Sequence, residues 1–330
     1  MRAPTPRLAA LLAAAAVVVA GILTNGASAA APVAASAPHH PVYLPPIVPP
    51  PVALPVGVPI VAAGQPTPVN MAYFGGPVLV RPKIYLIFWQ WASPSDPAAQ
   101  RLVGFFRGVG GSRWEGVATQ YTMTVGGKRV AVTNPAGQLA GVWFDNATPI
   151  HDNLADIEIA REAARGVRHF GTAPDPQALY MVATPVSDNT KGFNQGGYCA
   201  YHDYTLTKYY PGVMQHIAFA NMPYVEKVGG SCGANLVNSG QAGNYDGVTL
   251  ASGHEYLEAI TDPGAEDHGI GGWYDFNHEE NGDKCAYVNN GPGAAENITL
   301  ATGTYPVQGT WSNEAADGVG YCADARGTGL

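Results

Sequence analysis

The chain has few basic residues, and this shortage limits the partners that it can bind. Its 330 residues contain 17 Lys and Arg against 25 Asp and Glu, which gives a formal net charge of −8. So few cations cannot neutralise many phosphate groups, and the composition therefore argues against nucleic-acid binding and against a polybasic membrane-surface role. Hydrophobic residues make up 46% of the chain, which is ample for a packed core and excludes wholesale disorder.

Long apolar runs are also scarce, and the one that stands out lies at the start of the sequence. Arg2 and Arg7 flank the beginning of an apolar run over 8–23, and Ala-Ser-Ala follows at 27–29. This pattern is typical of a secretory signal peptide, which we expect over 1–30, with an uncleaved anchor as the alternative. We therefore expect a secreted protein, extracellular or cell-wall-associated, that has no membrane segment after cleavage.

Cysteine is rare, and the four that occur fit a protein that is exported and oxidised. Cys199, Cys232, Cys285 and Cys322 allow three pairings. Pairing in sequence order closes two loops of similar size, each stabilising the fold by roughly 3–4 kcal/mol, but the sequence leaves the connectivity open. A metal site built from these cysteines is disfavoured, because no two of them are close in sequence.

Proline and the hydrophobic pattern divide the rest of the chain. Residues 31–70 are dominated by Pro, Val and Ala, which indicates a semi-rigid linker or arm, or a pro-segment that covers a site. Residues 71–330 are expected to form a single globular domain without internal repeats.

Within this domain, apolar runs of strand length alternate with stretches of helical periodicity. The expected strands are 78–80, 84–89, 179–182 and 216–220, and the expected helices open at 96–97 and cover 152–170 and 248–261. Alternation of this kind favours an α/β fold with a layered sheet, flanking helices and some parallel pairing, with α+β as the alternative. The remainder, after Pro263, is expected to be irregular and held by a disulfide.

The third expected helix carries the motif H-E-x-x-E. His254 and Glu258 are four residues apart, so they lie on one face and can bind one metal ion. Glu255 is turned by about 100° and is the candidate general base, as in zincin-type H-E-x-x-H peptidases. Glutamate in place of the second histidine keeps an oxygen ligand, but its charge makes the ion a weaker Lewis acid.

The alternative for this motif is a surface helix with solvated acids. The helix is substantially apolar, however, so its acids are expected to be partly enclosed and to need a partner. The only cations near in sequence are Lys227 and Lys284. A cation such as zinc would satisfy the acids.

Zinc needs a third protein ligand, and several residues could provide it. Glu280 and Asp283 lie close to Cys285, whose disulfide would fix their direction. The density of Asp, Asn and Gly over 262–283 could also bind calcium, although the EF-hand spacing is missing. The histidines that remain as candidate ligands are His202, beside Cys199, and His268 and His278.

Four motifs give the chain a resemblance to a known family. They are Gly-Tyr-Cys-Ala-Tyr-His (197–202), His-Glu-Tyr-Leu-Glu-Ala-Ile-Thr-Asp-Pro (254–263), Gly-Trp-Tyr-Asp (272–275) and Glu-Asn-Gly-Asp-Lys-Cys (280–285). Their order resembles that of the plant phosphate-induced (EXORDIUM-like) secreted proteins and their bacterial relatives, over roughly residues 75–323. The family is regarded as extracellular and growth-related, without an established enzymatic activity, and Ala200 and Asn281 depart from its usual Gly and Ile. The resemblance implies a shared metal-like site at His202, His254, Glu255, Glu258, Glu280 and Asp283.

Taken together, the sequence predicts a secreted zinc-dependent hydrolase that acts on peptide bonds as a monomer. Its zinc would be held by His254, Glu258 and Glu280, with Glu255 as general base. One alternative is a non-catalytic extracellular or wall-associated protein, in which the cluster binds metal structurally or not at all. Another is an amidase or glycan-active enzyme with a cell-wall polymer as substrate.

Overall fold

The structure is a computed structural model. It describes residues 70–171, 173–187, 190–193, 198–264, 271–286, 288, 290–291 and 293–326. The chain divides into two units, Met1–Val33 and Ala34–Leu330, and every described residue belongs to the second. The expected signal peptide (1–30), nearly all of the expected Pro-rich arm (31–70) and His268 lie outside the described residues.

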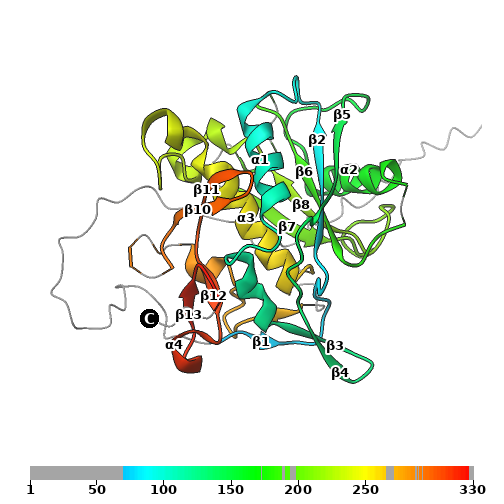
Figure 1. The fold of residues 1–330 in the computed structure, drawn as a ribbon. Coiled ribbons are helices and arrows are strands. Elements are labelled where there is room, and N and C mark those ends of the chain that lie inside the picture. Colours follow the sequence, from blue (N-terminus) through cyan, green and yellow to red (C-terminus); the bar gives the residue numbers. More distant parts are fainter. Residues whose placement is uncertain are drawn as a thin grey trace, which may run out of the picture. The chain divides into compact units, whose positions relative to one another are not determined.

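A five-stranded mixed sheet forms the centre of the described part, in the order β5-β2-β6-β8-β7 (Figure 1). Its strands are β2 (Lys83–Trp89), β5 (Leu139–Asp145), β6 (Ala178–Ala183), β7 (Tyr201–Tyr204) and β8 (Ala218–Met222). Four of them run parallel, and β7 pairs antiparallel with β8 at one edge. The predicted α/β class with a layered sheet is thereby confirmed, together with the strands expected near 84–89, 179–182 and 216–220.

Helices cover both faces of this sheet, as Figure 1 shows. They are α1 (Pro97–Gly108), α2 (Asp156–His169) and α3 (Asp246–Thr261). The chain passes from β2 through α1 to β5, and then through α2 back across β2 to β6. Because such crossovers are right-handed, reversing the direction of travel places α1 and α2 on opposite faces. Helix α3 packs beside α1 and against β7 and β8, so it is enclosed between the sheet and other elements.

Short elements complete the fold, and most of them are two-stranded antiparallel pairs. The pairs are β1 (Ala72–Tyr73) with β9 (Trp273–Tyr274), β3 (Thr122–Val125) with β4 (Lys128–Ala131), β10 (Glu296–Leu300) with β11 (Gly303–Val307), and β12 (Thr310–Ser312) with β13 (Tyr321–Ala323). The short helices are η1 (Glu115–Gln120), η3 (Val225–Lys227), η4 (Gly229–Cys232), η5 (Gly240–Tyr245), η7 (Asp283–Cys285) and α4 (Ala315–Gly318).

The prediction of a strand at 78–80 is wrong. This apolar segment is buried but belongs to no strand, because the Leu79 N–H donates to the carbonyl of Ile260 (2.8 Å) near the end of α3. Its hydrophobicity therefore reflects packing against a helix.

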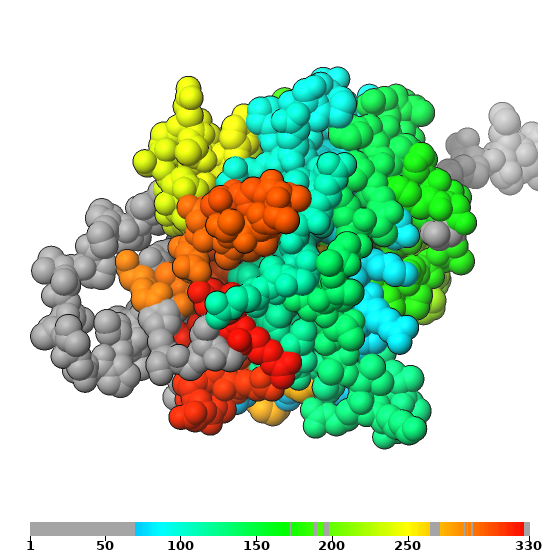
Figure 2. All heavy atoms as spheres, viewed as in Figure 1, coloured from blue at the N-terminus to red at the C-terminus, as the bar shows by residue number. Residues whose placement is uncertain are grey.

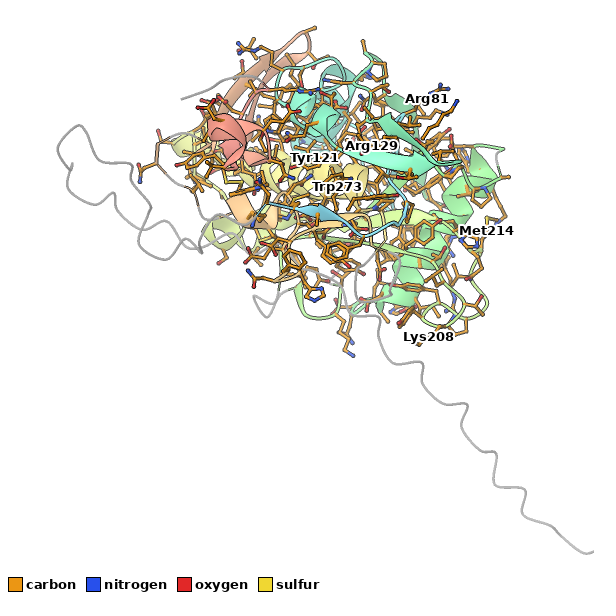
Figure 3. The ribbon with its side chains drawn as sticks, turned by 90° about the horizontal axis from the view of Figure 1, so that it is seen from below. Arg81, Tyr121, Arg129, Lys208, Met214 and Trp273 are labelled. Carbon is orange, nitrogen blue, oxygen red and sulfur yellow. A yellow bond between two sulfur atoms is a disulfide. The ribbon has the colours of Figure 1, made fainter. Side chains whose placement is uncertain are left out.

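The C-terminal segments lie against the helical layer. Figure 2 shows the orange β10–β11 region over the cyan segment that contains α1, where Thr302 Oγ1 donates to the carbonyl of Gly104 (2.7 Å). On the underside, Trp273 packs against Tyr121 with ring centroids 5.2 Å apart (Figure 3). As a result, all sixteen residues of α3 are buried, as is typical of a helix that is enclosed on every side.

Two disulfides hold the later part of the chain, Cys199–Cys232 and Cys285–Cys322. They pair the four cysteines in sequence order, which is one of the three connectivities that the sequence left open. Disulfides are typical of chains that fold in an oxidising compartment. Within the described part, no helix is long and apolar enough to span a bilayer.

Candidate metal centre

Helix α3 contributes three side chains to a buried cluster of acids and histidines. His254 and Glu258 are one turn apart, and Nε2 of the imidazole lies 2.9 Å from Oε1 of the carboxylate. Glu255 points to a different side of the helix, as its position in the turn requires. His254 and Glu258 thus share one face of α3, while the carboxylate of Glu255 meets that of Glu258 on the side of His202.

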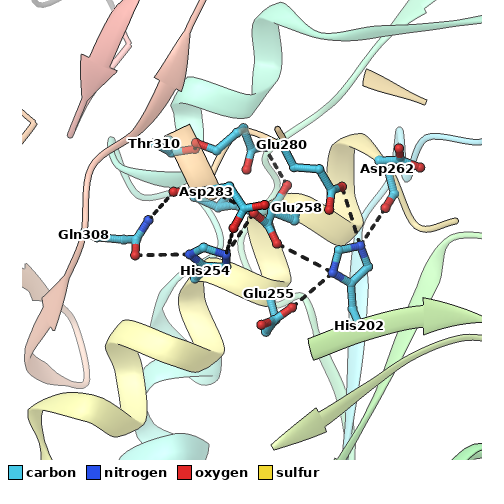
Figure 4. Close-up of polar contacts among 12 residues, drawn as sticks. His202, His254, Glu255, Glu258, Asp262, Glu280, Asp283, Gln308 and Thr310 are labelled. Carbon is cyan, nitrogen blue, oxygen red and sulfur yellow. Dashed lines mark hydrogen bonds and ion pairs between the residues drawn. The ribbon is translucent and has the colours of Figure 1, made fainter. Parts of the chain in front are cut away.

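The sheet contributes a second histidine. Strand β7 carries His202, whose Nδ1 lies 3.1 Å from Glu255 Oε2 and 3.7 Å from Glu258 Oε2. Figure 4 shows Glu258 between the imidazoles of His202 and His254. One carboxylate thus faces two histidines, through a different oxygen on each side.

The third element is the loop at 280–285, which docks on α3 through backbone contacts. The Asp283 N–H donates to Glu258 Oε1 (2.9 Å), and the Asn281 side chain donates to the carbonyl of Leu257 (2.9 Å). Gly282 permits this approach, because a Cβ there would lie 2.8 Å from Glu258 Oε1 and 2.9 Å from the His254 ring. The docked loop places Asp283 Oδ1 3.4 Å from His254 Nε2.

Each imidazole is held from behind by an oxygen acceptor. His254 Nδ1 lies 3.1 Å from Gln308 Oε1, and the same amide donates through Nε2 to the carbonyl of Gly282 (2.7 Å). His202 Nε2 lies 2.9 Å from the carbonyl oxygen of Asp262. In both rings one nitrogen therefore donates outward, and the other faces two carboxylates. Histidines that bind metals are usually held in this way.

Burial and charge act in opposite directions on these groups. Burial alone would lower the pKa of His202, but the hydrogen bond and charge of Glu255 and the charge of Glu258 raise it to about 9. Burial likewise opposes protonation of His254, whose pKa is nevertheless raised by Glu258 and Asp283. Burial raises the pKa of Glu258 to about 7, although the nearby His254 lowers it. The neighbouring carboxylates thus favour the protonated form of both imidazoles.

The basic residues nearest in sequence are engaged elsewhere. The Lys284 ammonium lies 2.5 Å from Asp275 Oδ2, and Lys227 donates to the carbonyl of Val186 (3.1 Å). Within the described part of the chain, no Lys or Arg forms a salt bridge with Glu255 or Glu258. The groups that face Glu255 and Glu258 are therefore the imidazoles of His202 and His254 rather than a lysine.

The structure brings five of the predicted residues into two overlapping groups of metal-ligating type. One is His254, Glu258 and Asp283, and the other is His202, Glu255 and Glu258; within each group the ligand atoms all lie within 4.8 Å of one another. Glu280, predicted as the third ligand beside His254, instead lies 3.7 Å from Nε2 of His202. His278 stacks on Tyr274, with ring centroids 5.5 Å apart, and belongs to neither group. No described contact identifies a calcium site.

Two residues of the site escaped the sequence analysis. Gln308 has no local motif that marks it, because it comes from the end of β11, 54 residues after His254. Gly282 did carry a signal, since it lies between Asn281 and Asp283 in the segment that the resemblance had singled out.

Comparison of the chain with family models, curated proteins and solved structures found no match.

Proposed function

We propose that this protein is an exported zinc-dependent hydrolase that acts on peptide bonds, with His254, Glu258 and Asp283 as the zinc ligands. The observation that carries this proposal is the group formed by one imidazole nitrogen and two carboxylates within 4.8 Å of one another. Three protein ligands leave one of the four zinc positions for water or substrate, as in catalytic rather than structural zinc sites.

The separations among these ligand atoms suit zinc. Bonds of 2.0–2.2 Å in a tetrahedron place neighbouring ligand atoms about 3.3–3.6 Å apart. His254 Nε2 lies 2.9 Å from Glu258 Oε1 and 3.4 Å from Asp283 Oδ1. The donor set of nitrogen and carboxylate oxygen is also one that zinc accepts. Bound zinc would supply Lewis acidity toward a carbonyl oxygen and make a coordinated water more acidic.

The residues around this position divide the remaining tasks. The Asp283 side chain is 21% exposed, while those of His254 and Glu258 are fully buried, so a substrate would approach from the Asp283 side. With one ion bound, Glu255 is the carboxylate of the H-E-x-x-E motif that is left to act as general base. His202 orients it through Oε2.

A second candidate function is a non-catalytic extracellular protein with a structural metal. The burial of His254, Glu255 and Glu258 favours it, because substrates need access to a catalytic ion. The resemblance to the EXORDIUM-like family is compatible with either function, since its members are regarded as extracellular without an established activity.

Metal analysis combined with a hydrolysis screen tests the proposal. We expect the purified protein to retain zinc, the double variant His254→Ala/Glu258→Ala to lose it, and peptide cleavage to disappear with the metal. His151→Ala is the matched control, because this exposed histidine also pairs with a glutamate, Glu158 (2.7 Å), but lies outside the site. Absence of bound metal after zinc is supplied would refute the hydrolase. Zinc that is retained without cleavage of peptides or cell-wall amides would favour the structural role.

A further inference from the structure

We infer that the cluster has a second cation position, held by His202 and Glu255, and that Glu258 bridges the two ions. The inference rests on the proposed function, because it extends the metal site described there. It turns a single zinc centre into a two-metal centre. Centres of this kind hold their ions 3.5–4 Å apart and serve in hydrolytic enzymes.

The geometry at His202 resembles that at His254. Nδ1 of His202 lies 3.1 Å from Glu255 Oε2 and 3.7 Å from Glu258 Oε2. These distances bracket the separation of about 3.3–3.6 Å expected between ligands of one tetrahedral ion. The other ring nitrogen lies 2.9 Å from the carbonyl oxygen of Asp262. That contact turns Nδ1 toward the two carboxylates.

Two buried carboxylate oxygens point independently to a ligand. Glu255 Oε1 and Glu258 Oε2 accept no hydrogen bond from any described residue, although both side chains are fully buried. Buried polar atoms are nearly always partnered. Glu258 Oε1 already accepts from the Asp283 N–H and contacts His254, whereas Oε2 is the oxygen that faces His202. A carboxylate directed to both sides in this way can bridge two ions.

The charges of the cluster also favour more than one divalent cation. Four carboxylates have an oxygen within 4 Å of one of the two imidazoles: those of Glu255, Glu258, Glu280 and Asp283. If all four carboxylates are ionised and both imidazoles are neutral, one divalent ion leaves two negative charges in the cluster, and two ions leave none. Uncompensated buried charge is strongly unfavourable. In the two-ion state Glu255 is a ligand, and its loss removes an ion.

Zinc stoichiometry tests this inference directly. The full-length mature protein is stripped of metal, loaded with excess zinc, desalted and analysed for zinc per chain. We expect two ions in the wild type, one in His202→Ala and one in Glu255→Gln. Glu255→Gln is nearly isosteric and keeps an acceptor for His202, so it tests the position even if His202→Ala folds poorly. The exposed-site variant His151→Ala should keep both ions. Loading with Mn²⁺ provides a second readout, because two bridged ions give a spin-coupled electron paramagnetic resonance spectrum that either variant should abolish.

The outcomes separate the two proposals. A single zinc in the wild type that is lost in His254→Ala but kept in Glu255→Gln would overturn the second position and leave the proposed function intact. A single zinc that is lost in both variants would mean one shared ion, and would also overturn it. No zinc in any variant would overturn the proposed function together with the inference.

Discussion

Two groups of buried polar side chains contact helix α3, and they accommodate their acids in different ways. In the first, the Tyr256 hydroxyl donates to Gln138 Oε1, and Gln138 Nε2 donates to Glu115 Oε1. In the second, Glu255 and Glu258, which flank Tyr256 in sequence, face two imidazoles and further acids. On one side, α3 thus contacts a single acid, Glu115, through neutral partners. On another side it carries part of a dense cluster of acids and histidines.

The difference shows what decides how a buried acid is stabilised. Glu115 has a neutral amide as its partner, so burial raises its pKa to about 8 and it remains protonated at neutral pH. One acid can be neutralised by one proton, whereas the cluster around Glu258 contains too many acids close to histidines that are themselves readily protonated. We therefore expect the first group to respond to pH and the second to metal.

The largest expected effect is that of metal removal. A ligand present at about 1,000 times its dissociation constant stabilises the folded state by roughly 4 kcal/mol, on the order of 10 °C in Tm for a domain of this size. We expect a chelator to lower the Tm of the zinc-loaded wild type by about this amount. Calorimetry on His254→Ala/Glu258→Ala should show no dependence on zinc or chelator. Equal shifts in both proteins would place the responsible metal elsewhere.

Glu115→Gln tests whether the first group, which contains Glu115, Gln138 and Tyr256, responds to pH. The folded-state pKa of about 8 lies above the ordinary value of 4.5, so the protonated acid stabilises the fold below pH 4.5, and this contribution is lost as the pH rises through 8. Glutamine stays neutral throughout. The variant should therefore gain on the order of 3 kcal/mol over the wild type between pH 5 and pH 9 in denaturant titrations.

The control for this change is Glu314→Gln, at an exposed acid that pairs with Arg326 at 3.1 Å. Its unfolding free energy should stay within about 0.5 kcal/mol of the wild type across the same pH range. If the difference in unfolding free energy between Glu115→Gln and the wild type does not change with pH, Glu115 is not buried as a neutral acid.

A methyl group at Gly282 should disturb the metal cluster without touching the Glu115 group. The added Cβ would lie below 3.0 Å from both Glu258 and the His254 ring, so Gly282→Ala must push the loop or the helix aside. We expect a loss of about 2 kcal/mol in stability, as for an overpacked core, together with weaker zinc binding in a competition assay. Gly230→Ala is the matched control, because a Cβ there meets no heavy atom within 4 Å.

The sequence predicted local features of the fold and site better than long-range ones. Helix α3 and the pairing of His254 with Glu258 follow from spacing within a single helix, and β2 follows from one continuous apolar run. Strand β5 was missed although residues 139–144 contain no charged or strongly polar residue, because Ala140 and Gly141 interrupt the run of large β-forming side chains that marked β2. Glu115 and Gln138 gave no signal, because 118 residues separate Gln138 from the tyrosine that binds it.

The difference between local and long-range features also explains why Asp283, and not Glu280, lies beside His254. Glu280 and Asp283 are three residues apart and were both candidates on sequence grounds. Which of them reaches His254 depends on how the loop docks, and that is decided by contacts of Asn281 with Leu257 and Thr261 on α3. Such contacts have no sequence pattern of their own.

The smallest effect is expected from the residue that holds His254 from behind. Gln308→Leu removes both the acceptor for the ring and the donor to the Gly282 carbonyl, and loss of such an outer partner should weaken zinc binding at least about tenfold, or 1.4 kcal/mol. Gln308→Glu keeps the acceptor and should recover part of the affinity. Neither change alters the backbone oxygen of Gln308, which accepts from Trp114 Nε1 (2.8 Å). A loss of zinc affinity would therefore not be explained by a loss of this backbone contact after β11. If both variants bind zinc as the wild type does, the contact of Gln308 with His254 does not support the zinc site.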